Sequence, residues 1–515
     1  MVTGDQSAVI AFLADACTHG GAEVERIDTH SAVVFLAGPV AYKLKRAVLF
    51  DYLDFSTPDR RRLMCEAEVR LNRRTAPTLY HGVLPVTREA DGSLALGGRG
   101  EPVDWVVVMQ RFPQDALFDR LAAAGRLDVS LMPALAAAVA RCHASAETRP
   151  DHGGTAGMLW VIDGNAAGFA DQGADILDAG GCEELTACAR RELARCASLL
   201  EGRRAAGFVR HGHGDLHLRN IVLHEGAPTL FDCIEFDDRI ACADVLYDLA
   251  FLLMDLWRRG LPRHANVVWN AYLSTAGVFD GLALLPLFLS CRAAVRAKTS
   301  ATAARLQADT AARGELEALA REYLVMARAF LGPPGASLVA IGGLSGTGKS
   351  TVAFGVAPNV GPVPGAVVIR SDEIRKQMCG VPAAQRLGPE AYTAEMSVRV
   401  YDAILARAAV VVGQGHSAVV DAVFDRADER AAVERCAREC GVPFAGLWLE
   451  APEAVLVSRV AQRQHDASDA DAAVVRLQQH RVTGAVAWPH VDASGSAADV
   501  LLAVRDRLPS RANSQ

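Results

Sequence analysis

The sequence lacks paired cysteines. Its twelve Cys lie scattered through both halves, and none forms a C-x-x-C pair. Disulfide-stapled domains and zinc ribbons need cysteines at regular short spacings. The scattering therefore argues against both and favours reduced thiols inside a folded core.

Long apolar runs and a basic leader are also missing. The longest apolar run, GLALLPLFLSC at 281–291, is too short to cross a bilayer, and the first twenty residues contain no Lys or Arg. The formal net charge of −7 gives no general attraction to nucleic acid or anionic lipid. We expect a cytoplasmic protein that binds small diffusible molecules and no membrane; the sequence leaves its oligomeric state open.

What is present is a globular composition, with 51% hydrophobic and 22% charged residues in a chain of 515. That length exceeds what one hydrophobic core usually serves. The clearest boundary is LGPPGAS, residues 331–337, where two prolines end a long helical stretch. We expect a first domain over 1–331, a linker over 332–337 and a second domain over 338–515.

The first domain opens with β-strand patterns. Residues 30–46 read as two strands joined by a turn at Gly38-Pro39, followed by a helix capped by Ser56. Ala-rich helical periodicity then dominates. The pattern predicts a β-rich lobe over about 1–112 and a helical lobe over about 113–331.

The second domain alternates strands and helices, which is typical of a parallel sheet covered by helices. Its most specific motif is GLSGTGKST, which fits G-x-x-x-x-G-K-[ST] between a strand and a helix. Glycines let backbone N–H groups approach phosphates, a lysine there meets the β and γ phosphates, and the hydroxyl after it binds Mg²⁺. The competing interpretation is a chance Gly-rich turn. The candidate nucleotide ligands are Gly343, Gly346, Gly348, Lys349, Ser350 and Thr351.

Further candidates follow the next strands of this domain. Asp372 and Arg375 come directly after the strand AVVIR, where a carboxylate can accept a proton from a hydroxyl and an arginine can hold negative charge. A helix N-cap is the alternative role for Asp372. Asp421 ends the strand SAVVD and is a candidate to direct Mg²⁺ through water.

Arg459 and Arg463 lie near an acidic run, four residues apart. That spacing suits either a lid over ATP or a solvated helix face. This half therefore contains the phosphate-binding loop GLSGTGKST (the P-loop), the D-x-x-R sequence of Asp372 and Arg375, and the strand-end Asp421. Together these features resemble the small P-loop kinases of the AAA, zeta-toxin and gluconate-kinase type, and the resemblance covers nearly all of 337–508.

In the first domain, FVRHGHGDLHLRNIVLHEG at 208–226 holds four His, one Asp and one Asn. A zinc site could use His211, His213, His217 and His224, but no supporting H-E-x-x-H or cysteine pair is present. A buried core histidine explains neither the Asp nor the Asn. The third interpretation is a kinase catalytic loop, H-x-D-L-x-x-x-N, in which Asp215 accepts the hydroxyl proton and Asn220 binds Mg²⁺.

Partners for this loop occur in the expected order. Val40-Ala41-Tyr42-Lys43 matches the V-A-I-K strand, which makes Lys43 the phosphate ligand, and Glu68 on the next helix is its ion-pair partner. Asp232 ends a strand 12 residues after Asn220 and is the second Mg²⁺ ligand. Lys45 and Glu66 remain open as alternatives for the Lys–Glu pair, because the register of strand and helix is not fixed by sequence.

HGDLHLRN, LFDCIEFDD and ADVLYDLAFL together resemble the aminoglycoside phosphotransferase family of protein-kinase-like enzymes, over most of 25–330. The resemblance implies that Asp244 and Asp248 brace the loop and that 104–112 form the hinge strand at adenine. Two departures are the missing Gly-rich loop before Lys43 and the missing Gly of D-F-G. The fused order resembles a bacterial two-domain family.

We therefore expect an α+β protein-kinase-like bilobal domain followed by an α/β P-loop domain. The expected activity is a bifunctional kinase that uses ATP and Mg²⁺ to phosphorylate hydroxyls of small, sugar-like or aminoglycoside-like acceptors. Two alternatives stay open. One is a nucleotide-sensing regulator with one catalytic half; the other is a second half that phosphorylates nucleic-acid 5′-hydroxyls, against which the acidic charge argues. The sequence does not identify the acceptors, or choose between ATP and GTP.

Overall fold

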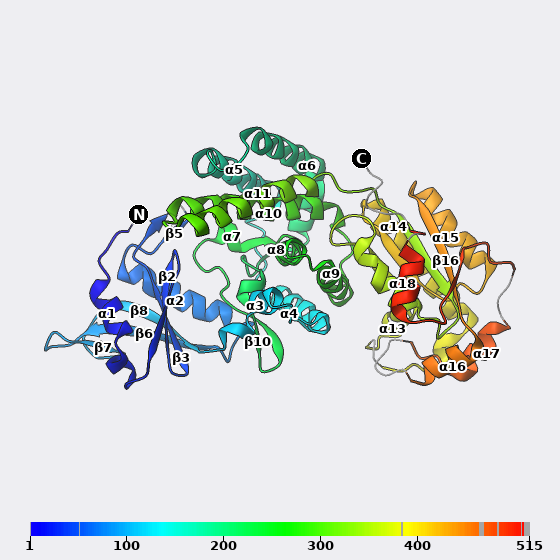
Figure 1. The fold of residues 1–515 in the computed structure, drawn as a ribbon, viewed down its shortest axis with the longest axis horizontal. Coiled ribbons are helices and arrows are strands. Elements are labelled where there is room, and N and C mark those ends of the chain that lie inside the picture. Colours follow the sequence, from blue (N-terminus) through cyan, green and yellow to red (C-terminus); the bar gives the residue numbers. More distant parts are fainter. Residues whose placement is uncertain are drawn as a thin grey trace. The chain divides into compact units, whose positions relative to one another are not determined.

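The computed structural model describes residues 2–50, 52–382, 385–462, 468–480, 484–505 and 507–508. The chain packs as two compact units, Met1–Asp163 with Ala197–Asp255 and Gly164–Cys196 with Leu256–Gln515. Figure 1 shows the first strands in blue and the C-terminal α/β part in yellow to red. In the described ranges no helix is long and apolar enough to cross a membrane.

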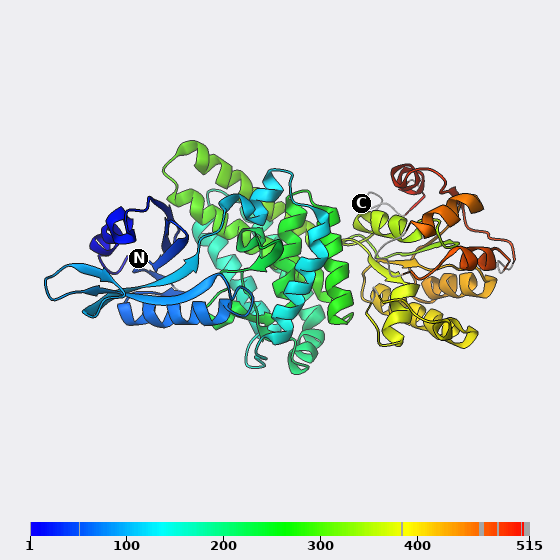
Figure 2. The same cartoon turned by 90° about the horizontal axis from the view of Figure 1, so that it is seen from below.

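The first unit contains an antiparallel six-stranded sheet in the order β1-β2-β3-β8-β6-β7. The predicted turn joins β2 to β3, with Gly38 at φ +54°. Alternate side chains point to opposite faces, so Ala41 packs toward α2 (Pro58–Asn72) while Leu44 packs toward α1 (Ser7–Ala14). Figure 2 shows α2 lying along the sheet. The strands are β1 Val24–Asp28, β2 Ala32–Ala37, β3 Val40–Lys45, β6 Tyr80–Arg88, β7 Leu94–Leu96 and β8 Glu101–Gln110.

Helix α2 begins one residue later than predicted. Thr57, not Ser56, is the N-cap, and its Oγ1 accepts from the Arg60 amide at 3.3 Å. Ser56 instead donates its hydroxyl to Asp54 at 2.6 Å, which removes it from the cap. The helix buries Glu68 on its sheet-facing side, where an acidic residue needs cationic partners.

The rest of the first unit consists of helices and short strand pairs. In the ladder of β9 and β12, Cys242 lies directly opposite His211. The sheet of β10 and β11 flanks the loop predicted to be catalytic. The remaining elements here, some of which continue into the second unit, are β4 Leu49–Phe50, β5 Leu53–Asp54, α3 Phe118–Ala123, α4 Met132–Ser145, α5 Gly154–Gln172, α6 Ala179–Ala205, β9 Val209–His211, β10 Ile221–His224, β11 Ala227–Leu230, α7 Asp238–Ala241, β12 Cys242–Asp244 and α8 Val245–Arg258.

The second unit contains the predicted parallel sheet, in the order β14-β15-β13-β16-β17. Its core includes Val339 and Ile341 of the central strand with Val352 of the following helix. The strands are β13 Leu338–Gly343, β14 Val367–Arg370, β15 Ala418–Asp421, β16 Phe444–Glu450 and β17 His490–Asp492. The helices of this unit are α9 Pro262–Ala276, α10 Leu285–Leu306, α11 Thr310–Phe330, α12 Lys349–Val356, α13 Ser371–Met378, α14 Ala394–Gly413, α15 Ala427–Glu439, α16 Glu453–Ala461, α17 Ala472–Gln479 and α18 Ala497–Arg505.

Two asparagines of α9 bind the backbone of β14. Asn266 is fully buried, and its Nδ2 donates to Ala366 O at 3.1 Å. Asn270 accepts from the Val368 amide at 2.7 Å and donates to Ala366 O at 3.2 Å. Residues 256–330 thus pack in one unit with the parallel sheet, and the compact units divide elsewhere than at 332–337.

Candidate active sites

The first site contains Lys43, Glu68 and Asp232. The Lys43 ammonium on β3 donates one hydrogen bond to Glu68 Oε1 at 2.8 Å and another to Asp232 Oδ1 at 2.5 Å. Burial alone would raise the pKa of Glu68, but the charges of Lys43 and Lys45 outweigh it and lower the pKa to about 2. The carboxylate of Glu68 is therefore ionised at neutral pH and holds both ammonium groups.

Lys45 and Glu66, the alternative members of the Lys–Glu pair, lie in different places. Lys45 also reaches Glu68, with Nζ 2.6 Å from Oε2, and contacts Glu235. Glu66 lies on the exposed side of α2, where its Oε1 is 3.5 Å from Arg62. The structure thus brings both lysines to Glu68 and leaves Glu66 away from them.

Asp215 and Asn220 meet in the loop after β9. Asn220 Nδ2 donates to Asp215 Oδ2 and to the Asp215 carbonyl, both at 3.0 Å, and His217 Nε2 lies 3.3 Å from Asp215 Oδ2. Gly214 has φ +80°, and a Cβ there would lie 2.9 Å from Ile234 Cγ1. A side chain before Asp215 would therefore disturb the loop.

Asp248 braces this loop as expected. Its carboxylate accepts from the backbone amides of His213 at 2.7 Å and Gly214 at 3.0 Å. Asp244, expected to act beside it, instead forms a buried ion pair with Arg203, at 2.7 Å between Oδ2 and Nε. Sequence reasoning missed Asp255, which accepts from the Leu218 amide at 3.0 Å. The sequence pattern that could have identified Asp255 is its position seven residues after Asp248, because this spacing places both side chains on one side of α8.

The zinc interpretation does not fit the four histidines together. His213 Nε2 bonds to Phe231 O at 2.9 Å, and His224 Nε2 contacts Thr78 at 3.2 Å, so one ring nitrogen of each already has another partner. Among the described residues, the possible ligand atoms of these four histidines do not gather into one group.

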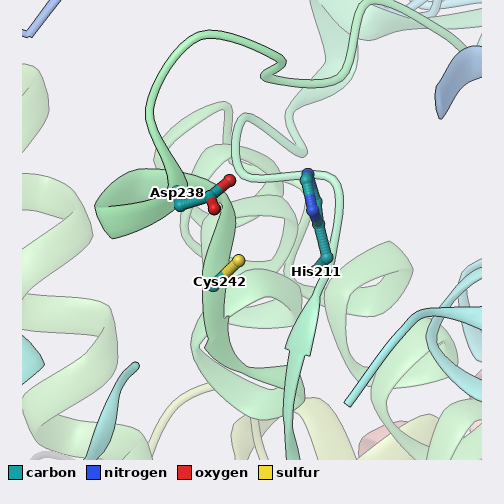
Figure 3. Close-up of side chains that lie close together, drawn as sticks. All are labelled: His211, Asp238 and Cys242. Atoms are coloured by element: carbon teal, nitrogen blue, oxygen red, sulfur yellow. The ribbon is translucent and has the colours of Figure 1, made fainter. Parts of the chain in front are cut away.

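A different group, His211, Asp238 and Cys242, places one possible ligand atom from each residue within 4.8 Å of the others. The three side chains face one another in Figure 3. However, Arg149 donates to Asp238 at 2.9 Å and to Cys242 Sγ at 3.4 Å. Since a guanidinium cation already neutralises this group, its arrangement is explained without a metal.

The second site is the P-loop between β13 and α12. Gly346 has φ +90°, and a Cβ there would lie 2.7 Å from Leu456 O. Lys349 and Thr351 lie in the first turn of α12, where Lys349 Nζ donates to Leu344 O at 3.0 Å. Gly343 and Gly348 also have positive φ, +138° and +86°.

Ser350 and Asp421 meet at the carboxyl edge of the sheet, with 2.6 Å between Oγ and Oδ2. Hydroxyl and carboxylate oxygens are ligands that suit Mg²⁺, directly or through water, so these residues fit the ion. Arg370, which sequence reasoning missed, donates to Ser350 at 2.9 Å and to Asp421 at 3.3 Å. A cationic side chain thus neutralises the carboxylate in this structure.

Asp372 and Arg375 lie on α13 beside this edge. Burial raises the pKa of Asp372, and the neighbouring Asp421 raises it further. Asp372 is not the N-cap of α13. Arg370 occupies that position, and Asp372 is the second residue of the helix. Arg375 is buried, donates to Ala391 O at 2.7 Å and lies 4.9 Å from the centre of the Tyr392 ring.

The structure does not bring Arg459 to the P-loop. Its guanidinium donates to the carbonyls of Ala493 at 2.7 Å and Gly495 at 2.8 Å, because α16 runs beside this turn. Arg463 lies outside the described residues. Gln478 of α17, which sequence reasoning missed, accepts from the Ser345 amide at 2.8 Å and so reaches the P-loop instead.

Comparisons with known proteins support both resemblances. Residues 56–285 match the model of the phosphotransferase enzyme family, and residues 338–485 match that of an AAA domain. The solved structure of a choline/ethanolamine kinase family protein from Mesorhizobium loti aligns with a TM-score of 0.37 and 15% identity, over 62% of this chain and 98% of that chain.

Two relatives are similar in sequence. An adenylyl-sulfate kinase of Myxococcus xanthus is 30% identical over 117 residues, 23% of this chain and 59% of that enzyme. An uncharacterized protein of Mycobacterium tuberculosis is 30% identical over 456 residues, 87% of this chain and 88% of that protein. The chain belongs to the family of this mycobacterial protein and is a kinase, with a phosphotransferase domain followed by a P-loop domain.

Proposed function

We propose that the chain is a bifunctional kinase that uses ATP and Mg²⁺ at two separate sites, each transferring the γ-phosphoryl group to a hydroxyl of a small molecule. The observation that supports this most is that each unit has its own lysine for phosphates and its own carboxylates for a metal and a proton. In the first unit these are Lys43, Asp232 and Asp215; in the second they are Lys349, Asp421 and Asp372.

In the first site, Asp215 accepts the proton of the acceptor hydroxyl as the oxygen attacks phosphorus. Its bond to the Asn220 amide holds the carboxylate in place. The side-chain oxygens of Asn220 and Asp232 fit Mg²⁺, which supplies charge neutralisation at the phosphates. Lys43 meets the α and β phosphates while Glu68 keeps its ammonium oriented.

In the second site, backbone N–H groups of 343–351 surround the phosphates and Lys349 compensates their charge. Ser350 and Asp421, whose side chains meet at 2.6 Å, would hold Mg²⁺ there, and the ion would neutralise phosphate charge. Asp372 accepts the acceptor's proton, and Arg375 holds charge on the acceptor. Because burial favours the protonated form of Asp372, its carboxylate is more basic than an exposed one.

The acceptors we propose are small hydroxyl compounds, sugar-like or aminoglycoside-like. The similarity to an adenylyl-sulfate kinase supports a small molecule rather than a nucleic acid, and the net charge of −7 agrees. The cytoplasm supplies ATP and keeps the free cysteines reduced, so we place the reaction there.

The test uses the full chain with γ-labelled ATP and a panel of hydroxyl metabolites. Asp215→Asn should strongly reduce labelling of one set of acceptors, and Asp372→Asn should strongly reduce labelling of another. If every product disappears with one substitution and none with the other, one half is a nucleotide sensor. Labelling of oligonucleotide 5′ ends that falls with salt would instead identify the second half as a nucleic-acid kinase.

A further inference from the structure

A second lysine on β3 shares the carboxylate that orients Lys43. Lys43 and Lys45 are two residues apart on one strand, so both side chains lie on the same face of the sheet. Glu68 binds Lys43 through Oε1 at 2.8 Å and Lys45 through Oε2 at 2.6 Å. Lys45 also forms an ion pair with Glu235, three residues after Asp232.

The side chains of Lys43 and Lys45 differ in exposure, which indicates that the two lysines have different roles. The side chain of Lys45 is 2% exposed and both of its acidic partners are at most 5% exposed, while Lys43 is 16% exposed and Asp232 is 41% exposed. A phosphate can reach Lys43 and not Lys45. The Lys45 ammonium also lies 4.9 Å from the centre of the Phe55 ring.

Buried ion pairs of this kind add little stability compared with well-packed hydrocarbon, because both charges must leave water. The arrangement fixes positions instead. Holding one oxygen of Glu68 on Lys45 leaves the other oxygen directed at Lys43.

The segment that carries Asp232 also needs anchors. Residues 231–235 form neither helix nor strand, and Asp232 itself has φ +60°. Tyr80 Oη accepts from the Asp232 amide at 3.1 Å, and Asn72 Oδ1 accepts from the Cys233 amide at 3.0 Å. Glu235 adds the charged anchor, in a segment that lacks the Gly of D-F-G.

We propose that Lys45 is a positioning residue of the first site, which holds Glu68 opposite Lys43 and, through Glu235, holds the Asp232 segment against the sheet. Lys43 now binds Asp232, but in the transfer reaction Lys43 must meet phosphates and Asp232 the metal ion. Lys45 keeps Glu68 and Glu235 in place during this exchange. The inference rests on the proposed function of the first site.

The experiment uses the full chain carrying Lys349→Ala, so that nucleotide binding reports on the first site. Calorimetry with ATP is done at a series of Mg²⁺ concentrations. Lys45→Met should raise the Mg²⁺ concentration needed for half-maximal ATP binding by about tenfold, the scale of one charge-assisted contact. Glu235→Gln should act in the same direction, Lys45→Arg should restore most of the binding, and the exposed Arg88→Met on β6 is the matched control.

The double variant Lys45→Met with Glu235→Gln separates positioning from general damage. If both act through one contact, the double variant should need no more Mg²⁺ than the worse single variant. Unchanged Mg²⁺ dependence in a folded Lys45→Met or Glu235→Gln protein would overturn the inference, as would ATP binding lost at every Mg²⁺ concentration, which indicates a direct phosphate ligand. If Lys45→Met fails to fold, Glu235→Gln decides alone. Absence of ATP binding before any change at Lys45 or Glu235 would instead contradict the proposed function.

Discussion

Asn220 holds Asp215 from within the same loop, with its amide nitrogen 3.0 Å from both the side-chain Oδ2 and the main-chain carbonyl of the aspartate. The carboxylate therefore has a fixed direction. Such fixing matters for a group that must receive one proton at one point of the reaction.

Asp215→Asn should lower transfer at the first site by roughly 10²-fold or more, the scale of a lost general base. ATP binding should remain, because the amide has nearly the same shape and Lys43 is untouched. Rates with an identified acceptor, together with calorimetry, check both parts. Turnover equal to that of the unchanged protein would contradict the role given to Asp215.

Asp232→Ala should weaken binding of ATP in the presence of Mg²⁺ and have less effect when Mg²⁺ is chelated. The reason is that the substitution removes a metal ligand while leaving Lys43 and Glu68 paired. Titrations with and without chelator measure the difference. Equal loss under both conditions would indicate that Asp232 acts only as a partner of Lys43.

Calorimetry on the intact chain should show two nucleotide sites. Lys349→Ala should remove one and Lys43→Ala the other, because each lysine compensates phosphate charge at its own site. A single site in the unchanged protein would contradict the proposal. Loss of both sites with either substitution would contradict it too, and would mean that the two halves work as one composite machine.

Glu68→Gln should destabilise the protein by about 3 kcal/mol at neutral pH, the scale of breaking a buried ion pair. The folded-state pKa of Glu68, about 2, lies below its ordinary value of 4.5. Its contribution is therefore complete above 4.5 and is lost as the pH falls toward 2. Denaturant unfolding at several pH values should show the two proteins converging in acid; a constant difference would contradict the ion-pair account.

The sequence predicted the strands and motifs well because each is a local pattern. An apolar run followed by glycines places the P-loop without knowledge of the fold, and H-x-D-L-x-x-x-N contains Asp215 and Asn220 within one loop. Partners distant in sequence could not be read this way. Lys45 meets Glu235 across 190 positions, and Arg370 meets Asp421 across 51, so neither contact has a local signature. The sequence spacing of Arg459 suits a lid. Its contacts with 493–495, however, depend on how the turn after β17 packs against α16.

The asparagines of α9 have a consequence for the handling of the protein. β14 is an edge strand, and Asn266 and Asn270 occupy its outward-facing carbonyl of Ala366 and amide of Val368. A fragment beginning at 338 would lose α9 and leave these groups open. Bare strand edges pair with other chains, so the P-loop half made alone should self-associate through β14 more readily than the full chain does.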